Sequence, residues 1–130
     1  MALVPSYQNV QIASHHRLDT ANTALDGTGT LVTLLELPGS QYNKGALIEQ
    51  VVLNRPSGTA GTALEVRLFV DDGVNIRYVD SLDLAADAQA QTIKIYDSAT
   101  FVLSMEPGQT LKAAVTVSEN VNVFVSGGVY

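Results

Sequence analysis

The stretch LEVRLFV, residues 64–70, alternates apolar and other side chains without a break. Leucine or valine stands at positions 64, 66, 68 and 70, and Glu65, Arg67 and Phe69 stand between them. An apolar residue at every second position places one face of a β-strand on a core and leaves the other toward solvent. The stretch therefore predicts a strand that is buried on one face.

The same period of two recurs over most of the chain. It is regular over residues 111–118 and 121–126, where valine is frequent, and β-branched side chains pack well on a pleated sheet. Less regular apolar runs predict further strands at residues 30–37, 46–55, 75–82, 91–96 and 100–105. Residues 83–90 are interpreted as a loop. Because apolar residues at helical spacing are nearly absent, the expected structure consists of strands.

Turn sequences separate these segments. Each combines a residue that tolerates positive φ with one that presets or caps a turn, and they lie at residues 26–29, 38–40, 56–58, 71–73 and 107–108. About eight short strands separated by such turns predict an all-β fold, an antiparallel β-sandwich of jelly-roll or Greek-key type. A jelly roll is favoured because several connections are longer than tight hairpins.

The length and composition fit a single core. The chain has 130 residues, of which 46% are hydrophobic and 15% charged, and a chain of this size can bury a stable core without disulfide or metal support. It has no cysteine, which excludes disulfides, cysteine-ligated metal sites and thiol catalysis. We expect residues 29–130 to form the β-sandwich domain and residues 1–28 to form an N-terminal arm.

The arm contains apolar residues that would be costly to leave in water, namely Leu3, Val4, Tyr7, Val10 and Ile12. Two outcomes are open for it. The arm docks on a neighbouring subunit or surface, and these five residues are then candidate interface residues. Alternatively, part of it is an ordinary first strand of the same domain.

The charge balance limits the partners. Thirteen acidic residues against seven basic ones give a net charge of −6, whereas binding to a phosphate backbone needs clustered Lys and Arg. We therefore expect no nucleic-acid partner. No window approaches the ~18 consecutive apolar residues of a membrane span, so no membrane partner is expected either. The N-terminal sequence lacks the basic and apolar regions of a signal peptide, which predicts a protein made in the cytoplasm without secretion.

Two clusters offer metal-ligand chemistry, and both have simpler interpretations. His15 and His16 are adjacent, so on an extended segment they point to opposite faces and do not aim at one metal ion. Asp71 and Asp72 precede Gly73 and superficially resemble the start of a calcium loop, but Asp-Gly between alternating strands is a strong hairpin signal. We expect a turn there and predict no metal site.

Catalytic motifs are lacking as well. The sequence has no Gly-x-Ser-x-Gly elbow and no glycine-rich phosphate loop of the Walker or dinucleotide type. Neither histidine lies in a context that marks a general base. The chain is therefore not expected to be an enzyme, no catalytic residue is assigned, and no cofactor is expected.

Two aromatic residues stand out on the predicted strands. Phe69 and Phe124 lie on strand faces opposite the apolar sets of their neighbours. This position indicates either a core sealed on both sides or a hydrophobic contact surface, since large exposed apolar groups tend to mark interfaces. Both alternatives are open, and both residues are candidate interface residues.

Several segments resemble small proteins from the head-gene modules of tailed bacteriophages. They are RLFVDDG at 67–73 continued by NIR at 75–77, GALIEQVV at 45–52, PGQTLKA at 107–113, ENVNV at 119–123 and GGVY at 127–130. The similarity covers most of residues 20–130 and leaves out the N-terminal arm. These segments are strand and turn patterns without chemically reactive residues.

The resemblance implies a virion structural protein. Its expected role is that of a capsid decoration or cement protein, which binds the exterior of an assembled shell of the major capsid protein as a symmetric homo-oligomer, expected to be a trimer. A second hypothesis is a receptor- or carbohydrate-binding β-sandwich module of a tail fibre or baseplate. In that case grooves between subunits and exposed tyrosines would matter.

Overall fold

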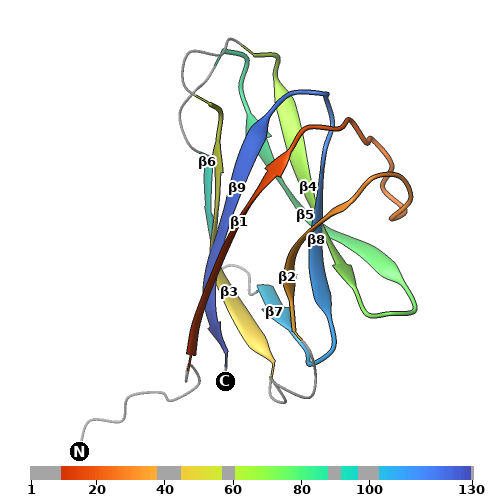
Figure 1. The fold of residues 1–130 in the computed structure, drawn as a ribbon, viewed down its shortest axis with the longest axis vertical. Coiled ribbons are helices and arrows are strands. Elements are labelled where there is room, and N and C mark those ends of the chain that lie inside the picture. The colour runs from red at the N-terminus through yellow and green to blue at the C-terminus, as the bar shows by residue number, and fades with distance from the viewer. Residues whose placement is uncertain (1–9, 38–44, 57–60, 88–91, 97–102, 130) are drawn as a thin grey trace, which may run out of the picture.

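Nine strands make up the fold in Figure 1, which shows a computed structural model that describes residues 10–37, 45–56, 61–87, 92–96 and 103–129. They are β1 (Val10–Leu18), β2 (Val32–Glu36), β3 (Ala46–Asn54), β4 (Leu64–Asp71), β5 (Ile76–Leu84), β6 (Thr92–Ile95), β7 (Leu103–Met105), β8 (Thr110–Val115) and β9 (Val121–Val129). The all-β prediction is confirmed. The described part of the chain contains no helix that is long and apolar enough to cross a membrane.

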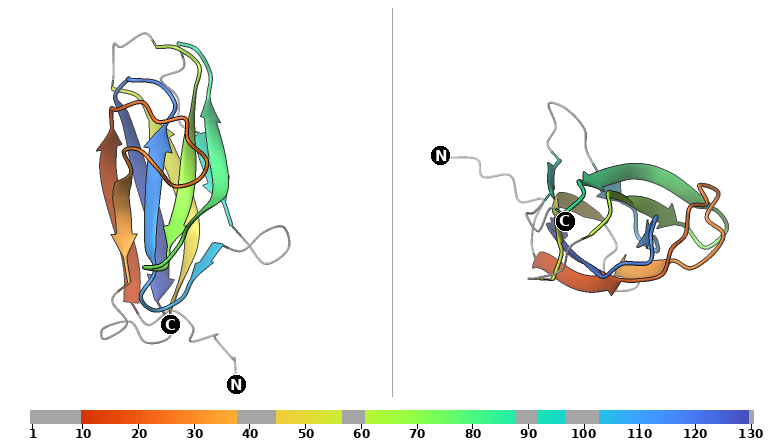
Figure 2. Two further views of the ribbon diagram at one scale, coloured as in Figure 1. Left: turned by 90° about the vertical axis from the view of Figure 1, so that its right-hand side faces the viewer. Right: turned by 90° about the horizontal axis from the view of Figure 1, so that it is seen from above.

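The strands form two antiparallel sheets that pack face to face (Figures 1 and 2). The first sheet has the order β1-β9-β3-β6, with the short strand β7 paired to β3, and the second has the order β2-β8-β4-β5. The chain changes sheet at most connections, and its first and last strands are neighbours. This order is that of a jelly roll, so the favoured form of the predicted sandwich is correct.

The core lies between the two sheets and follows the alternation seen in the sequence. On β4, Val66 and Leu68 are fully buried, and on β9, Val121 and Val123 are fully buried. Inward-facing residues of both sheets interdigitate in one apolar cluster. The period of two at 64–70 and 121–126 therefore identified two of the strands that build the core.

A β-bulge explains why the apolar pattern of β3 is irregular. The register with β9 shifts between Ile48 and Gln50, so β3 has one residue more than its partner at this point. Ile48 and Val51 are both fully buried although they are three residues apart. The extra residue keeps both halves of β3 turned toward the core and places Gln50 opposite Ser126 on the outer face.

The first strand corrects the expected domain boundary at residue 28. Strand β1 pairs with β9 along its whole length, from Val10 opposite Val129 to Leu18 opposite Val121. Leu18 is 1% exposed and belongs to the core. Of the two alternatives for the arm, the described part is therefore a strand of the sandwich, and the arm interpretation is wrong for residues 10–18.

The connection from β1 to β2, residues 19–31, lies over the outer face of the second sheet (Figure 2, left). The backbone N–H of Asn22 donates to the carbonyl of Val115 on β8 at 2.8 Å. From β4, Nη1 of Arg67 donates to the carbonyl of Thr23 at 2.6 Å. The connection is thus fixed to the two central strands of that sheet.

The side chain of Asn22 fixes the conformation of this connection through three hydrogen bonds. Its Nδ2 donates to the carbonyls of Thr28 and Thr30, both at 2.9 Å, and its Oδ1 accepts from the N–H of Ala24 at 3.0 Å. Gly29 has a φ of 81°, and a Cβ on it would lie 2.7 Å from Nδ2 of Asn22. Only glycine fits this position without strain.

Phe69 is buried on the outer side of the second sheet. Its side chain is 0% exposed, although it lies outside the cluster between the sheets, and its ring meets the ring of Tyr78 edge-on at 5.9 Å. The sealed-core alternative is therefore correct for Phe69, and its interpretation as an interface residue is wrong. Phe69 thus exposes no surface that a partner could contact.

A buried arginine ties three loops together at one end of the sandwich. Arg55 is 2% exposed, and its guanidinium donates to the carbonyls of Ala85, at 2.7 Å, and Thr62. Its Nη2 also lies 3.5 Å from Oε2 of Glu119. Gly61 packs so closely on this guanidinium that a Cβ there would clash with Nε.

Candidate functional site

Two neighbouring rows of side chains cross the outer face of the first sheet, each with one residue from β1, β9, β3 and β6. The strand registers place these residues directly opposite one another, on the side that faces away from the core. The first row is His15, Phe124, Val52 and Ile93, and the second row is Ala13, Ser126, Gln50 and Ile95. None of them is Asp, Glu, Lys or Arg, and we call these eight residues the uncharged face.

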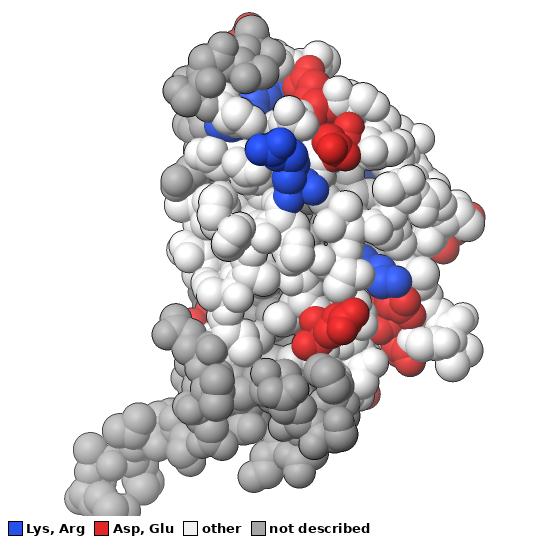
Figure 3. All heavy atoms as spheres, viewed as in Figure 1, with Lys and Arg blue, Asp and Glu red and all other residues white. Residues whose placement is uncertain are grey.

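Large apolar side chains of the uncharged face are in contact with solvent. Phe124 is 43% exposed, Ile93 49% and Ile95 65%. Single exposed apolar residues are normal, but several on one face indicate a contact surface. Figure 3 shows part of this side, and the middle of the molecule over β1 and β9 lacks charged atoms there.

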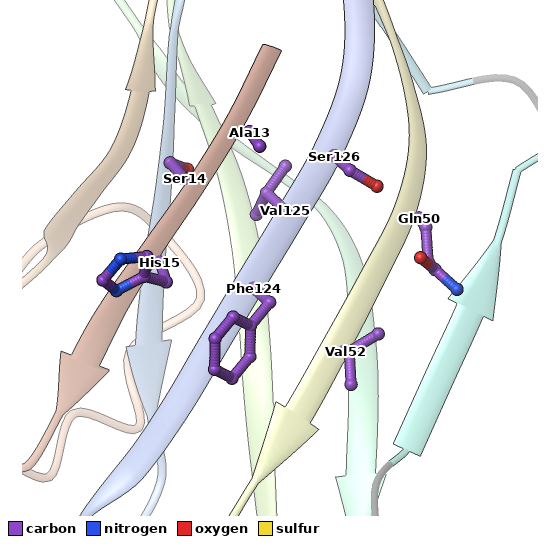
Figure 4. A pocket seen from close by; sticks show the side chains of 8 residues that line it. All are labelled: Ala13, Ser14, His15, Gln50, Val52, Phe124, Val125 and Ser126. Carbon is purple, nitrogen blue, oxygen red and sulfur yellow. The ribbon is translucent and has the colours of Figure 1, made fainter. Parts of the chain in front are cut away.

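A shallow pocket of about 230 Å³ lies in the uncharged face, over β1, β9 and β3. In Figure 4 the ring of Phe124 lies between His15 and Val52, with Gln50 and Ser126 on the other side of the pocket. The rings of His15 and Phe124 are 5.8 Å apart and tilted by 36°. The pocket is thus lined by an aromatic ring together with polar groups.

The polar groups of the pocket have hydrogen-bonding capacity that the protein leaves unused. Within the described ranges, no hydrogen bond is formed by the imidazole of His15, the amide of Gln50 or the hydroxyl of Ser126. The amide offers two donors and one acceptor oxygen, and the hydroxyl offers both functions. A ligand or partner that covers the pocket has to satisfy these groups, because a buried unpaired polar group is costly.

The histidine pair does not converge on one point. His15 lies on the outer face of β1 opposite Phe124, and His16, opposite Val123, belongs to the inward-facing set. In the part of the chain that the structure describes, no group of three or more His, Asp or Glu side chains could hold a metal ion. His15 is thus a residue of the pocket.

The two aspartates at 71 and 72 stabilise the β4–β5 hairpin. Oδ1 of Asp71 accepts from the N–H of Gly73 at 2.8 Å, and Oδ1 of Asp72 accepts from the N–H groups of Val74 and Asn75 at 2.8 and 2.7 Å. These bonds fix the turn that the Asp-Gly sequence predicts.

The remaining carboxylate oxygens of the hairpin form ion pairs. Oδ2 of Asp71 lies 2.8 Å from Nζ of Lys112, and Oδ2 of Asp72 lies 3.1 Å from Nη1 of Arg77. The hydrogen bond from Lys112 lowers the pKa of Asp71, and the backbone N–H of Asn75 lowers the pKa of Asp72. Both carboxylates are thus engaged by the protein itself, which agrees with a turn.

The predicted interface residues have different locations. Leu3, Val4 and Tyr7 lie outside the described residues. Val10 is the first residue of β1, and Ile12 is partly buried against the core. Phe124 is the one of the two predicted phenylalanines that lies on an accessible surface.

Sequence reasoning missed Ile93, Ile95 and Gln50. The alternation within residues 91–96 placed both isoleucines on one side of a strand, but it could not tell which side faces the core. That distinction depends on the pairing of β6 with β3, which brings Ile93 opposite Val52 and Ile95 opposite Gln50.

Comparison with known proteins does not assign the chain to a family. No family model matches it, and a search of curated proteins finds no match. The strand order alone defines the class of the protein, which is a jelly roll. The same architecture occurs in viral capsid proteins and in lectins.

Proposed function

We propose that the chain is a virion structural protein, a capsid decoration or cement protein that binds and stabilises an assembled phage shell as a symmetric oligomer, expected to be a trimer. The observation that carries the proposal is the uncharged face, with Phe124, Ile93 and Ile95 exposed. A protein that binds other proteins needs such a surface. The resemblance to phage head-module proteins gives the partner, the major capsid protein.

The architecture suits a protein that acts by binding. Its two sheets enclose one apolar cluster, and the network around Arg55 and the hydrogen bonds of Asn22 fix its longer connections. A rigid surface loses little conformational entropy when it binds. Each 100 Å² of apolar surface removed from water contributes roughly 2.5 kcal/mol, so many modest contacts can stabilise a shell.

The charge of the chain favours a place on the outside of the shell. A net charge of −6 opposes contact with packaged nucleic acid, whose phosphates are negative. A protein bound to the exterior of the capsid does not contact the packaged nucleic acid, so this repulsion does not arise there. We accordingly place the protein on the capsid exterior, after synthesis in the host cytoplasm.

Mixing experiments with shells test the proposal. Purified protein is incubated with undecorated phage shells, mature and expanded, and the mixture is sedimented. We expect binding that saturates at a fixed ratio of copies to capsid subunits, and shells that resist heating better than bare ones. The absence of saturable binding to mature and to expanded shells would overturn the proposal.

The pocket favours a second candidate, a carbohydrate-binding module of a tail fibre or baseplate. An aromatic ring flanked by unpaired polar groups, here Phe124 with Gln50 and Ser126, can accept the apolar face of a sugar and hydrogen-bond its hydroxyls. Titration with host-surface glycans, followed by NMR shifts at these three residues, distinguishes the candidates. Saturable glycan binding without shell binding favours the module.

A further inference from the structure

We propose that the hydroxyl of Tyr96 positions the exposed residues Ile93 and Ile95 of the uncharged face. Its hydrogen bond to Asp80 fastens strand β6, which carries both isoleucines, to the opposite sheet. That these isoleucines contact a shell rests on the proposed function, whereas their positioning can be measured in the isolated protein.

The side chains of β6 divide into two sets. Ile93 and Ile95 are 49% and 65% exposed, whereas the side chains of residues 92, 94 and 96 bond to β5 in the second sheet. Strand β6 is the last strand of the first sheet and β5 is the last of the second, and the two are in contact where the sandwich closes. Of residues 92–96, only Tyr96 belongs to the apolar cluster. No aliphatic side chain of these residues packs in the core, so hydrogen bonds fix the strand instead.

Two of the three side chains that reach β5 make bonds that solvent weakens. Oγ1 of Thr92 donates to the carbonyl of Asp83 at 2.6 Å, at the surface. Nζ of Lys94 lies 3.4 Å from the carbonyl oxygen of Ser81 and 3.4 Å from Oδ1 of Asp80. The side chain of Lys94 is 44% exposed, and exposed ion pairs contribute little to stability.

The third bond, from Tyr96 to Asp80, is short and shielded from water. The hydroxyl of Tyr96 donates to Oδ2 of Asp80 at 2.8 Å, and Tyr96 is 4% exposed. Asp80 is itself held, since its Oδ1 accepts from the N–H of Ser81 at 2.8 Å. Burial and the bond to Asp80 raise the pKa of Tyr96, so the phenol stays protonated and remains a donor. Because a hydrogen bond to a charged acceptor is stronger than a neutral one, this bond contributes most to holding β6.

The position of Tyr96 in the chain links this bond to the isoleucines. It follows Ile95 directly, and its backbone N–H donates to the carbonyl of Glu49 at 2.9 Å, at the bulge of β3. Tyr96 is thus held by the first sheet through its backbone and by the second sheet through its hydroxyl. The two isoleucines before it are thereby presented at fixed points. Side chains that are already ordered lose less conformational entropy when they bind.

Hydrogen exchange and methyl NMR test the positioning in Tyr96→Phe, which removes the hydroxyl and keeps the ring. Tyr78→Phe is the matched control, because Tyr78 lies on β5 with its ring against Phe69. In Tyr96→Phe we expect exchange at the amides of residues 92–96 to become about tenfold faster, and the methyl order parameters of Ile93 and Ile95 to fall. Exchange in β9 should stay unchanged, since a general loss of stability would speed both strands. The control should change neither.

A pair of substitutions at Asp80 tests the acceptor. Asp80→Asn keeps an oxygen that can accept from Tyr96, so exchange in β6 should stay close to the wild-type rate. Asp80→Ala removes the acceptor and should reproduce the effect of Tyr96→Phe. Unchanged exchange and methyl order in both Tyr96→Phe and Asp80→Ala would overturn the positioning and leave the proposed function standing.

Binding to undecorated phage shells separates the positioning from the proposed function. We expect Tyr96→Phe to bind shells about tenfold more weakly than the wild-type chain, and Tyr78→Phe to bind them equally well. A wild-type chain that does not bind shells overturns the proposed function, while a loosened β6 in Tyr96→Phe still supports the positioning. Equal shell binding by the wild-type chain and by Tyr96→Phe with a loosened β6 would overturn the role of the positioning in binding.

Discussion

Phe69 and Phe124 stand on the outer faces of opposite sheets, and the chain covers only one of them. Phe69 is 0% exposed and its ring packs edge-on against Tyr78, whereas Phe124 on β9 is 43% exposed. The sequence gives both residues the same pattern of neighbours. Of the two phenylalanines, the one on the first sheet is therefore the accessible one.

Because Phe69 is buried and Phe124 is exposed, replacing each by alanine should lower the stability of the protein by different amounts. Phe69→Ala should lower the free energy of unfolding by about 3–5 kcal/mol, because it empties a closed apolar site. Phe124→Ala should cost less than about 1 kcal/mol in the isolated subunit, because much of its ring is already in water. Urea unfolding of the isolated protein measures the two values. Equal losses would contradict the assignment of the covered side.

The covering connection depends on Asn22. Asn22→Ala removes three hydrogen bonds at once and should destabilise the protein by about 2 kcal/mol. Hydrogen exchange should become faster at the amides of residues 19–31. Thr20→Ala is a matched control, since the hydroxyl of Thr20 donates to the neighbouring Asp19 at the surface, and it should change little. Unchanged exchange in Asn22→Ala would show that other contacts hold the connection.

The burial of the Arg55 guanidinium leads to a second prediction about stability. Arg55→Ala leaves the carbonyls of Ala85 and Thr62 without their donor, and we expect a loss of about 3 kcal/mol in urea unfolding. Arg77→Ala serves as the control, because the side chain of Arg77 is 65% exposed and its pair with Asp72 is solvated. That change should stay within about 0.5 kcal/mol. Similar losses in both variants would contradict a special role for Arg55.

Acid should weaken the fold through the β4–β5 hairpin. The folded protein lowers the pKa values of Asp71 and Asp72 below their ordinary value of 3.8, so their ionised forms favour folding. This contribution is complete above the unfolded value and is lost as the pH falls through the lowered pKa values. Stability from urea unfolding should therefore decline below about pH 4, and less steeply in Asp72→Asn.

Lys112 provides the control for the acid effect. Because its hydrogen bond is the largest cause of the lowered pKa of Asp71, Lys112→Met should raise that pKa toward its ordinary value. An NMR titration of the Asp71 carboxyl measures the change directly. A titration of Asp71 that is the same in both proteins would show that the Lys112 pair has no effect in solution.

The sequence predicted the strands whose apolar residues alternate without interruption. Residues 64–70 and 121–126 are such cases, and both lie in the core sheets. Strand β1 was harder to predict because its inward-facing positions include Ser14 and His16, and its place depends on backbone pairing with β9. Local apolar spacing carries no information on such pairing.

The candidate site was predictable only in part, for the same reason. Phe124 was found because it is a large apolar residue on the strand face opposite the valines of residues 121–125. Its neighbours Val52 and Ile93 come from distant segments, and only the registers of β3 with β9 and β6 bring them together. The burial of Phe69 likewise involves a residue of another strand, Tyr78 of β5, which the register of β4 with β5 places beside it. Long-range pairing decided which of the two phenylalanines is accessible.

Electron cryo-microscopy of shells mixed with the protein tests the central claim most directly, namely that this jelly roll decorates the exterior of a capsid and binds it through the uncharged face. The map is predicted to show copies of the protein on the exterior of the shell, with the outer face of the β1-β9-β3-β6 sheet against capsid subunits. Bare shells, or copies bound with this face open to solvent, would contradict it.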